Sequence, residues 1–268
     1  MDWENSVSTV VYHDPDTYSG VLPGGAVESQ DPAWVTILSD VRKLCEDYPN
    51  GIVVIGGAAI WLHTRSCLDQ QFLQTSHDAD FYMGLQDFAS LRDMQEVVRN
   101  RRLGKYQMIR NDVDFDIYVE RNNDLVISYE DAQRFSESID GIRCACKEHL
   151  LILKLRAFED RMGSAKGSKD AKDIARLLVL LAEQPGRKAQ SLSLLRDEDL
   201  AFMKKIVDNP NVFQDIVQKN AHWAKQLRAL ATRGLDYVTS NHEHQNTLSD
   251  RTPRPISKRS NDGPEFGG

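Results

Sequence analysis

The chain has 268 residues, of which 41% are hydrophobic and 27% charged, a composition that is ordinary for a globular protein with a sizeable core. Its formal net charge of −7 argues against a protein coated with nucleic acid. No apolar run is long enough to cross a bilayer, so a membrane protein is not expected.

The first residues show neither a basic segment nor the apolar run of a signal peptide, and we expect a cytoplasmic protein. The four cysteines are too scattered along the chain for a disulfide framework, and we expect them to be structural.

Residues 1–30 are rich in Asp, Ser, Gly and Pro without a sustained hydrophobic period, which predicts a flexible N-terminal arm. Asp31 and Pro32 then predict the N-cap and first position of a helix. From Trp34 to Cys45 apolar residues recur every three or four positions, which is typical of an amphipathic helix that packs on a sheet.

The β-branched run over 52–55 predicts a buried strand that ends at Gly56 and Gly57. Ala58 to Leu62 follows with helical composition. A strand, a tight turn and a helix N-terminus together form a place where backbone N–H groups hold phosphate. We therefore expect Gly56 and Gly57 to lie against the phosphates of a ligand.

Two acidic pairs follow, each inside apolar sequence. Asp78 and Asp80 share one face of a predicted strand over 78–83, and Asp114 and Asp116 share one face of a predicted strand over 113–119. Like charges side by side on a strand are unfavourable unless a cation lies between them. Oxygen ligands without His or Cys favour magnesium or manganese over zinc, so these strands predict a Mg²⁺ or Mn²⁺ site.

The neighbouring elements are predicted from period and turn residues. They are a helix over 85–101, strands over 106–109 and 141–146, a turn at 111–112 that makes an antiparallel hairpin, and a short helix from 128 or 129 to 139. Ser76, two residues before Asp78, either hydrogen-bonds a phosphate or caps the strand.

From residue 147 onward the apolar period is helical. The predicted helices cover 147–162, 169–182, 197–207 and 212–237, with a flexible break over 163–168. The polar, proline-containing end predicts a disordered tail. The expected organisation is an arm (1–30), an α/β core (31–146), a helical region (147–240) and a tail (241–268).

The Gly-Gly turn, the Asp-x-Asp strand about twenty residues later and the further acidic strand resemble the DNA polymerase β-like nucleotidyltransferase superfamily. Glu148 to Leu155 and Lys169 to Leu178 make the chain similar to the minimal bacterial nucleotidyltransferases of the abortive-infection and toxin–antitoxin type. The similarity covers roughly residues 50–182. It implies an α/β (α+β) fold: a mixed sheet flanked by helices and followed by an all-helical C-terminal part.

The resemblance implies a metal-dependent enzyme that moves a nucleoside monophosphate from a nucleoside triphosphate, such as ATP, to an acceptor hydroxyl. The implied acceptor is a tRNA 3′ end or a protein side chain. The implied biological role is a toxin of a toxin–antitoxin or phage-defence system, with a cognate antitoxin. The alternatives are a small-molecule (aminoglycoside-type) nucleotidyltransferase and a catalytically inactive module that binds nucleotide or RNA.

The resemblance also assigns roles to the acidic residues. Asp78 and Asp80 are implied to bind magnesium. The third carboxylate, which would hold the ion that activates the attacking hydroxyl, is either Asp114 or Asp116. Both residues face the right way and both match the family pattern; of the two, we take Asp116 as the expected third metal ligand.

Roles for three residues of the helical region follow in the same way. Lys154 is implied to bind phosphate; the alternative is an ammonium group that snorkels from an apolar helix to the surface. Asp173 is implied to lie near the active site with Lys169 at its entrance. The alternative is an ordinary charged helix surface that Asp173 shares with Asp170.

Two basic clusters accompany these residues in the sequence. One contains Arg99, Arg101, Arg102, Lys105 and Arg110, and the other contains Lys166, Lys169 and Lys172. They are either solvated helix ends and loops, or a track for a polyanion such as a triphosphate or an RNA backbone.

Overall fold

The computed structural model describes residues 31–65, 73–76, 78–184 and 189–251. The predicted arm over 1–30 and the last part of the predicted tail, 252–268, lie outside the described residues. The helices are α1 (Pro32–Asp47), α2 (Gly56–Arg65), α3 (Leu85–Met94), α4 (Tyr129–Arg134), α5 (Lys147–Arg161), α6 (Ala165–Glu183), α7 (Asp197–Asp208), α8 (Pro210–Ile216) and α9 (Ala221–Arg251), with short 3₁₀ helices η2 (Arg101–Leu103) and η3 (Ala189–Leu194). The strands are β1 (Ile52–Ile55), β2 (Asp78–Met83), β3 (Val98–Asn100), β4 (Lys105–Arg110), β5 (Val113–Val119), β6 (Glu137–Ile139) and β7 (Ile142–Cys144).

The strands form one mixed seven-stranded sheet in the order β3-β4-β5-β2-β1-β7-β6. β2 runs parallel to β5 and β1 runs parallel to β7, and the other neighbours are antiparallel. The two acidic strands are therefore direct neighbours at the centre of the sheet.

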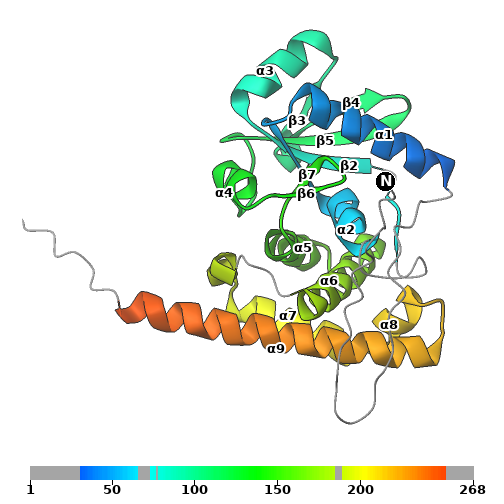
Figure 1. Ribbon diagram of the computed structural model, residues 1–268, viewed down its shortest axis with the longest axis vertical. Coiled ribbons are helices and arrows are strands. Elements are labelled where there is room, and N and C mark those ends of the chain that lie inside the picture. Colours follow the sequence, from blue (N-terminus) through cyan, green and yellow to red (C-terminus); the bar gives the residue numbers. More distant parts are fainter. Residues whose placement is uncertain (1–30, 66–72, 77, 185–188, 252–268) are drawn as a thin grey trace, which may run out of the picture.

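The face of the sheet opposite the aspartates is apolar. Phe81 and Phe115 stack on it with ring centroids 5.4 Å apart. α1 and α3 cover this face, and Phe88 of α3 packs on Tyr106 of β4 (Figure 1). A one-residue slip of β2 would turn Asp80 into this core, so the alternation of apolar and acidic residues fixes the register.

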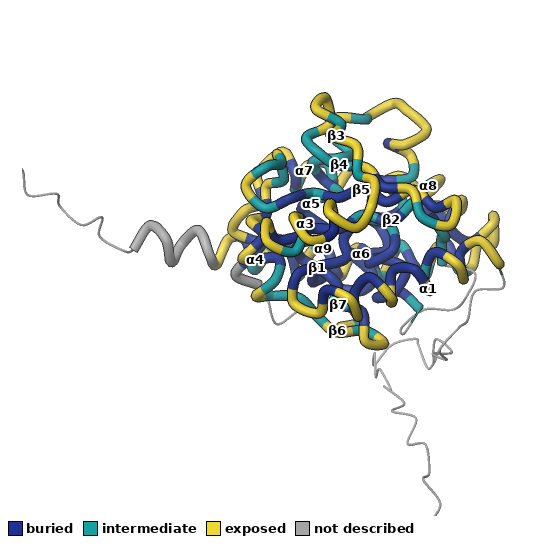
Figure 2. The backbone as a smooth tube through the Cα atoms, turned by 90° about the horizontal axis from the view of Figure 1, so that it is seen from above, coloured by how far each residue is buried: buried dark blue, intermediate teal, exposed yellow. Residues whose placement is uncertain are grey.

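α2, α5 and α6 cover the face that carries the aspartates, and α9 runs along the far side of α5 and α6 (Figure 1). One hydrophobic cluster extends from Trp34 in α1 to Val238 in α9. Figure 2 shows the buried positions running through the central strands and through α5 and α6, while positions around β3 are more exposed. The sheet and the C-terminal helices thus share one core.

This architecture confirms the expected fold class, a mixed sheet flanked by helices and followed by a helical C-terminal part. Within the described residues, no helix combines the length and the apolar character that a membrane span requires.

The predicted helix over 85–101 is wrong in its second half. α3 ends at Met94, Gln95 is extended with φ −133° and ψ 146°, and Val98–Asn100 pairs with β4 as strand β3. The β-branched Val97 and Val98 favour a strand once a partner strand lies beside them.

The short helix predicted to reach 139 also ends early, because α4 stops at Arg134 and Ile139 lies in β6. The break predicted over 163–168 is shorter than expected. Gly163 has a φ of 80°, and the hydroxyl of Ser164 accepts a hydrogen bond from the N–H of Gly167 at 3.0 Å, so α6 already begins at Ala165.

The helix predicted over 212–237 is two helices. Gln218 and Lys219 have φ values of 50° and 69°, which end α8 and allow α9 to start at Ala221 in a new direction. α9 then continues to Arg251, so residues 241–251 are helical rather than part of a disordered tail.

Candidate functional site

The four aspartates lie on one face of two neighbouring strands. Asp78 is paired with Asp114 and Asp80 with Asp116 in the parallel register of β2 and β5. Asp114 is exposed, whereas only 8% of Asp116 is exposed. The two-residue spacing therefore places the carboxylates on one face as predicted, but in different environments.

Gly56 and Gly57, predicted as a turn, are the first two residues of α2 and meet this face beside Asp80. Ile55, the last residue of β1, pairs with Asp80. Gly56 has a φ of 66°, and a Cβ atom there would lie 2.1 Å from Asp80 Oδ2. A Cβ atom on Gly57 would lie 3.2 Å from the hydroxyl of Ser76. Glycine at position 56 is thus required by its backbone and by the space that the Asp80 carboxylate occupies.

Asp80 is the most strongly perturbed acid of this face. Burial, followed by the charges of Asp78 and Asp116, raises the pKa of Asp80 to about 7. Lys154 and Lys105 act in the opposite direction without cancelling this rise. The two neighbouring carboxylates contribute to this rise after burial, and a bound cation would lower the pKa of Asp80.

The residues present fit a magnesium ion at Asp78 and Asp80. Both supply only oxygen ligands, and Mg²⁺ in proteins is commonly held by one or two carboxylates together with substrate phosphates. Among the described residues, no three or more His, Cys, Asp or Glu side chains are arranged to hold a metal ion by themselves, so an ion here would depend on these two carboxylates and on oxygen ligands from outside the chain.

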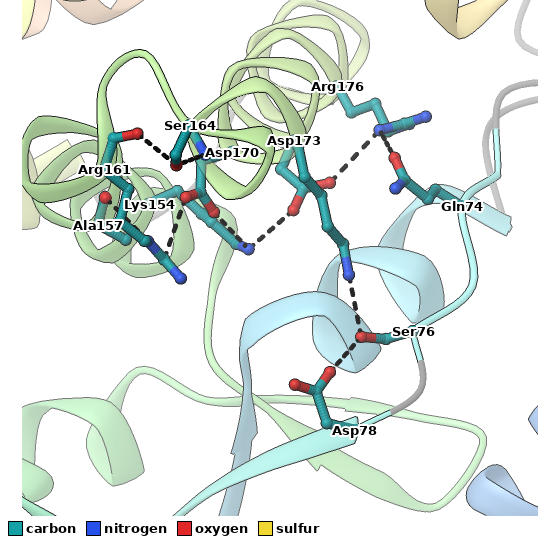
Figure 3. Close-up of polar contacts among 12 residues, drawn as sticks. Gln74, Ser76, Asp78, Lys154, Ala157, Arg161, Ser164, Asp170, Asp173 and Arg176 are labelled. Carbon is teal, nitrogen blue, oxygen red and sulfur yellow. Dashed lines mark hydrogen bonds and ion pairs between the residues drawn. The ribbon is translucent and has the colours of Figure 1, made fainter. Parts of the chain in front are cut away.

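Asp78 is connected to the C-terminal helices through Ser76 (Figure 3). The hydroxyl of Ser76 donates a hydrogen bond to Asp78 Oδ1, and Lys169 Nζ of α6 donates one to that hydroxyl at 3.1 Å. Burial acts to raise the pKa of Asp78, but the hydrogen bond from Ser76 and the charge of Lys169 outweigh it, so this pKa lies below its usual value. Asp78 is therefore held in its ionised form.

Lys154 lies between Asp170 and Asp173 at the contact of α5 with α6 (Figure 3). Its Nζ atom is 3.2 Å from Asp170 Oδ1 and 2.8 Å from Asp173 Oδ2. Burial opposes the charged form, but the two aspartates raise the pKa of Lys154 above its usual value. Both aspartates are buried, so the charged helix surface is wrong, and only 12% of the Lys154 side chain is exposed, so the snorkelling lysine is wrong as well.

Two arginines extend this ion cluster at either end. Arg161 Nη2 is 3.1 Å from Asp170 Oδ2, and Arg176 Nη1 is 3.3 Å from Asp173 Oδ1. Arg176 Nη1 also donates to Gln74 Oε1 at 3.0 Å, which fixes the segment that leads to Ser76. The cluster thus connects α5 and α6 to the start of the Asp-x-Asp strand.

Asp116 is held by groups of β4 that the sequence analysis missed. Lys105 Nζ bonds to its Oδ2 atom, and Gln107 Nε2 donates to its Oδ1 atom at 3.2 Å. The prediction started this strand at Tyr106 and assigned Lys105 to a basic cluster. The available signal was the alternation of polar Lys105 and Gln107 with Tyr106 and Met108.

Tyr118 is a second residue that was missed. It lies opposite Tyr82 in the register of β2 and β5, on the face of the aspartates. Burial, then the charges of Asp80 and Asp116, raise the pKa of Tyr118, while Arg161 acts in the opposite direction. The signal was the pattern Asp-x-Asp-x-Tyr, which both strands carry. Tyr118 adds a neutral phenol at the edge of the site.

The basic cluster around β4 is largely used within the fold. Arg99 donates to Asn122 Oδ1 at 2.9 Å, Lys105 pairs with Asp116, and Arg110 lies 3.6 Å from Asp40 Oδ1. The exposed Arg101 and Arg102 follow β3. The cluster is therefore not a continuous basic track.

No protein-family model matches this chain, and a search of curated proteins finds no similar sequence. Three solved structures are similar in architecture. A protein from H. pylori provisionally named a nucleotidyltransferase has 16% identity and a TM-score of 0.42, covering 83% of this chain and 99% of that one. JHP933 from Helicobacter pylori has 16% identity and a TM-score of 0.41, covering 83% and 97%. An antigenic nucleotidyltransferase-like protein from Paracoccidioides brasiliensis has 18% identity and a TM-score of 0.41, covering 75% and 94%. With TM-scores below 0.5, these similarities assign neither activity nor ligand to this chain.

Proposed function

We propose that this chain is a metal-dependent nucleotidyltransferase, which moves a nucleoside monophosphate from a nucleoside triphosphate to an acceptor hydroxyl. The observation that supports this is that Asp78, Asp80 and Asp116 lie on one face of the sheet beside Gly56. Lys169 is linked to Asp78 through the hydroxyl of Ser76. Carboxylates suit a divalent cation, and a helix N-terminus and ammonium groups suit the phosphates that the cation accompanies.

In this reaction the acceptor oxygen attacks the α-phosphorus of the triphosphate, and the bond to the β-phosphate oxygen breaks to release pyrophosphate. A divalent ion bound by Asp78 and Asp80 would neutralise charge on the phosphate oxygens. The first N–H groups of α2, from Gly56 onward, have no acceptor within the helix and are suited to phosphate oxygens.

The lysines have separate roles in this proposal. Lys169 stands at the rim of the site, beside Ser76 and Asp78, where its ammonium can reach a phosphate oxygen. Lys154 is enclosed by Asp170 and Asp173, and its charge acts on Asp80. We assign Lys154 to lowering the pKa of Asp80, which favours its ionised form, rather than to direct phosphate contact.

Incubation with nucleoside triphosphates labelled on the α-phosphate, Mg²⁺, total RNA and cell lysate tests the proposal. Asp80→Asn should lower transfer by at least about 100-fold, because the carboxylate that holds the cation is lost. Asp112→Asn is the matched control: Asp112 is exposed in the β4–β5 turn with a φ of 61°, which Asn also accepts. Unchanged transfer by Asp80→Asn would reject the metal assignment.

The position of the label identifies the acceptor. Label in RNA supports a tRNA-type acceptor, label in protein supports a side-chain acceptor, and label in a small molecule supports the aminoglycoside-type alternative. If the protein binds nucleotide but transfers no label to any acceptor, it is a binding module, and the enzyme proposal is contradicted. Comparison of the four bases gives the nucleotide preference.

The toxin role is proposed separately and has its own test. Expression of the wild-type chain should arrest growth, whereas expression of Asp80→Asn should not. Normal growth with an active wild-type protein contradicts a toxin role and leaves the transfer activity in place.

A further inference from the structure

The three clustered carboxylates differ in how the surrounding side chains satisfy them. Both oxygens of Asp116 are bonded, Oδ2 by Lys105 and Oδ1 by Gln107. Asp78 is bonded through Oδ1 by Ser76. The carboxylate of Asp80 accepts no side-chain hydrogen bond from the residues that the structure describes. Of the three, Asp116 is the one whose charge is already balanced by a direct cationic partner.

The groups around Asp116 are held in place by strand pairing. β4 pairs Gln107 with Asp116, and β3 pairs Asn100 with Lys105. Asn100 Nδ2 donates to Gln107 Oε1 at 3.2 Å, which turns the amide so that its Nε2 atom faces Asp116. The side chains of Lys105 and Asp116 are only 12% and 11% exposed. The Lys105–Asp116 ion pair is therefore shielded from solvent, although Gln107 beside it is exposed.

An ammonium group and a divalent ion cannot share the same carboxylate oxygen at contact distance without repelling each other. Displacing Lys105 would leave a poorly solvated ammonium group without its partner, which is strongly unfavourable. A second metal ion at Asp116 therefore has to overcome the existing pair.

We propose that Lys105 takes the place of a second divalent cation, so that the site binds one metal ion, on Asp78 and Asp80, while Asp116 stays paired with Lys105. The inference rests on the metal-dependent transfer proposed above and states how many ions that site takes. Lys105 is a positioning residue in this scheme: its bond to Oδ2 holds the Asp116 carboxylate in a fixed direction.

Counting bound Mn²⁺ by electron paramagnetic resonance, without nucleotide, tests this without relying on activity. The wild-type chain should bind one ion, and Lys105→Met should bind two, because Asp116 becomes available. Lys105→Arg keeps the charge and should bind one. Lys204→Met, at an exposed position of α7, is the matched control and should also bind one.

Asp116→Asn separates a metal ligand from a lysine partner. On its own it should leave the count at one ion, and in the Lys105→Met background it should return the count from two to one. If Lys105→Met does not fold, as judged by circular dichroism, Asp116→Asn alone decides: an unchanged count supports the inference and a lost ion overturns it.

The failures of the two proposals are distinguishable. Two ions bound by the wild-type chain, or one ion bound by folded Lys105→Met, overturns the role of Lys105 and leaves the proposed transfer standing. No ion bound by the wild-type chain at saturating Mn²⁺ overturns the metal site itself, and the inference with it.

Discussion

The carboxyl group of Asp80 links the stability of the fold to pH. Its pKa rises from the ordinary 3.8 to about 7 on folding, through burial and the charges of Asp78 and Asp116. Between these two values the folded chain keeps a proton that the unfolded chain has lost. The free energy of unfolding therefore falls as the pH rises from 3.8 to about 7. Above about pH 7 the whole destabilisation caused by this group is present.

Asp80→Asn should remove this dependence. Above about pH 7 we expect the variant to be more stable than the wild-type chain by about 2–4 kcal/mol, since one pKa unit corresponds to about 1.4 kcal/mol, and near pH 4 the difference should vanish. Urea unfolding over this pH range measures it. Mg²⁺ should stabilise the wild-type chain and not the variant; a difference that does not change with pH would contradict the assignment.

The two glycines of the turn should respond differently to the same substitution. Gly56→Ala places a Cβ atom against Asp80 Oδ2 and puts alanine at a positive φ, so we expect a loss of about 2–4 kcal/mol in stability together with loss of nucleotide transfer. Gly57→Ala meets only the Ser76 hydroxyl, at 3.2 Å, and should lose less than about 1 kcal/mol. Thermal unfolding and the transfer assay measure both. A loss at position 56 as small as the one expected at position 57 would show that Gly56 tolerates a side chain.

At the level of single residues, the sequence predicted the shared face of the aspartates because the period of a strand is two, whatever its neighbours are. It could not predict that Lys105 contacts Asp116, because that contact depends on the register between β4 and β5. Nor could it choose between Asp114 and Asp116. In the structure Asp116 is buried and its charge raises the pKa of Asp80, whereas Asp114 is exposed.

At the level of elements, strands with their own strong pattern were predicted and a strand that depends on its partner was not. β1, β2 and β5 have apolar or alternating sequences that identify them without tertiary information. β3 has three residues and exists through its pairing with β4, so the pattern around it was read as the end of a helix. The division between α8 and α9 depends on left-handed backbone at two non-glycine residues, which composition does not reveal.

Because α9 packs closely on α6, a Gly→Ala substitution in α9 should destabilise the chain, whereas the same substitution normally stabilises a helix. Gly→Ala inside a helix normally stabilises by about 1 kcal/mol, but a Cβ atom on Gly234 would lie 1.9 Å from the backbone oxygen of Leu178. We expect Gly234→Ala to destabilise the chain by about 1–3 kcal/mol, because the two helices must move apart. Ser240→Ala, at an exposed position of the same helix, is the control and should be neutral or slightly stabilising. Urea unfolding compares them, and a stabilised Gly234→Ala would mean that the contact is looser than described.

At the level of the whole molecule, the candidate site is assembled from both sides of the expected boundary at residue 146. Ser76 and Gln74, from the sheet side, bond to Lys169 and Arg176 of α6. The hydrophobic cluster is also continuous across that boundary. The change of period at 147 marks a change of secondary structure, and the sequence alone does not tell whether the core is divided there.

A shared core predicts that the sheet and the C-terminal helices unfold together. Trp34 and Trp61 pack edge to face at the sheet side, with ring centroids 5.5 Å apart, so they report on that part of the core. In a variant in which Phe replaces Trp3 and Trp223, the fluorescence comes from Trp34 and Trp61. This fluorescence and the far-UV circular dichroism, which is dominated by the helices, should give the same midpoint of urea unfolding.

A bound ligand should then shift the unfolding midpoints reported by the two probes equally. Mg²⁺ with a nonhydrolysable ATP analogue binds only the folded chain in this scheme, so it should raise both midpoints by the same amount as its concentration increases. Because residues from β2 and α6 meet at Ser76, binding cannot stabilise one part alone. Two separate transitions, or a ligand-induced shift of the midpoint in the tryptophan signal alone, would show that the two parts of the chain fold independently. The site would then not require both parts.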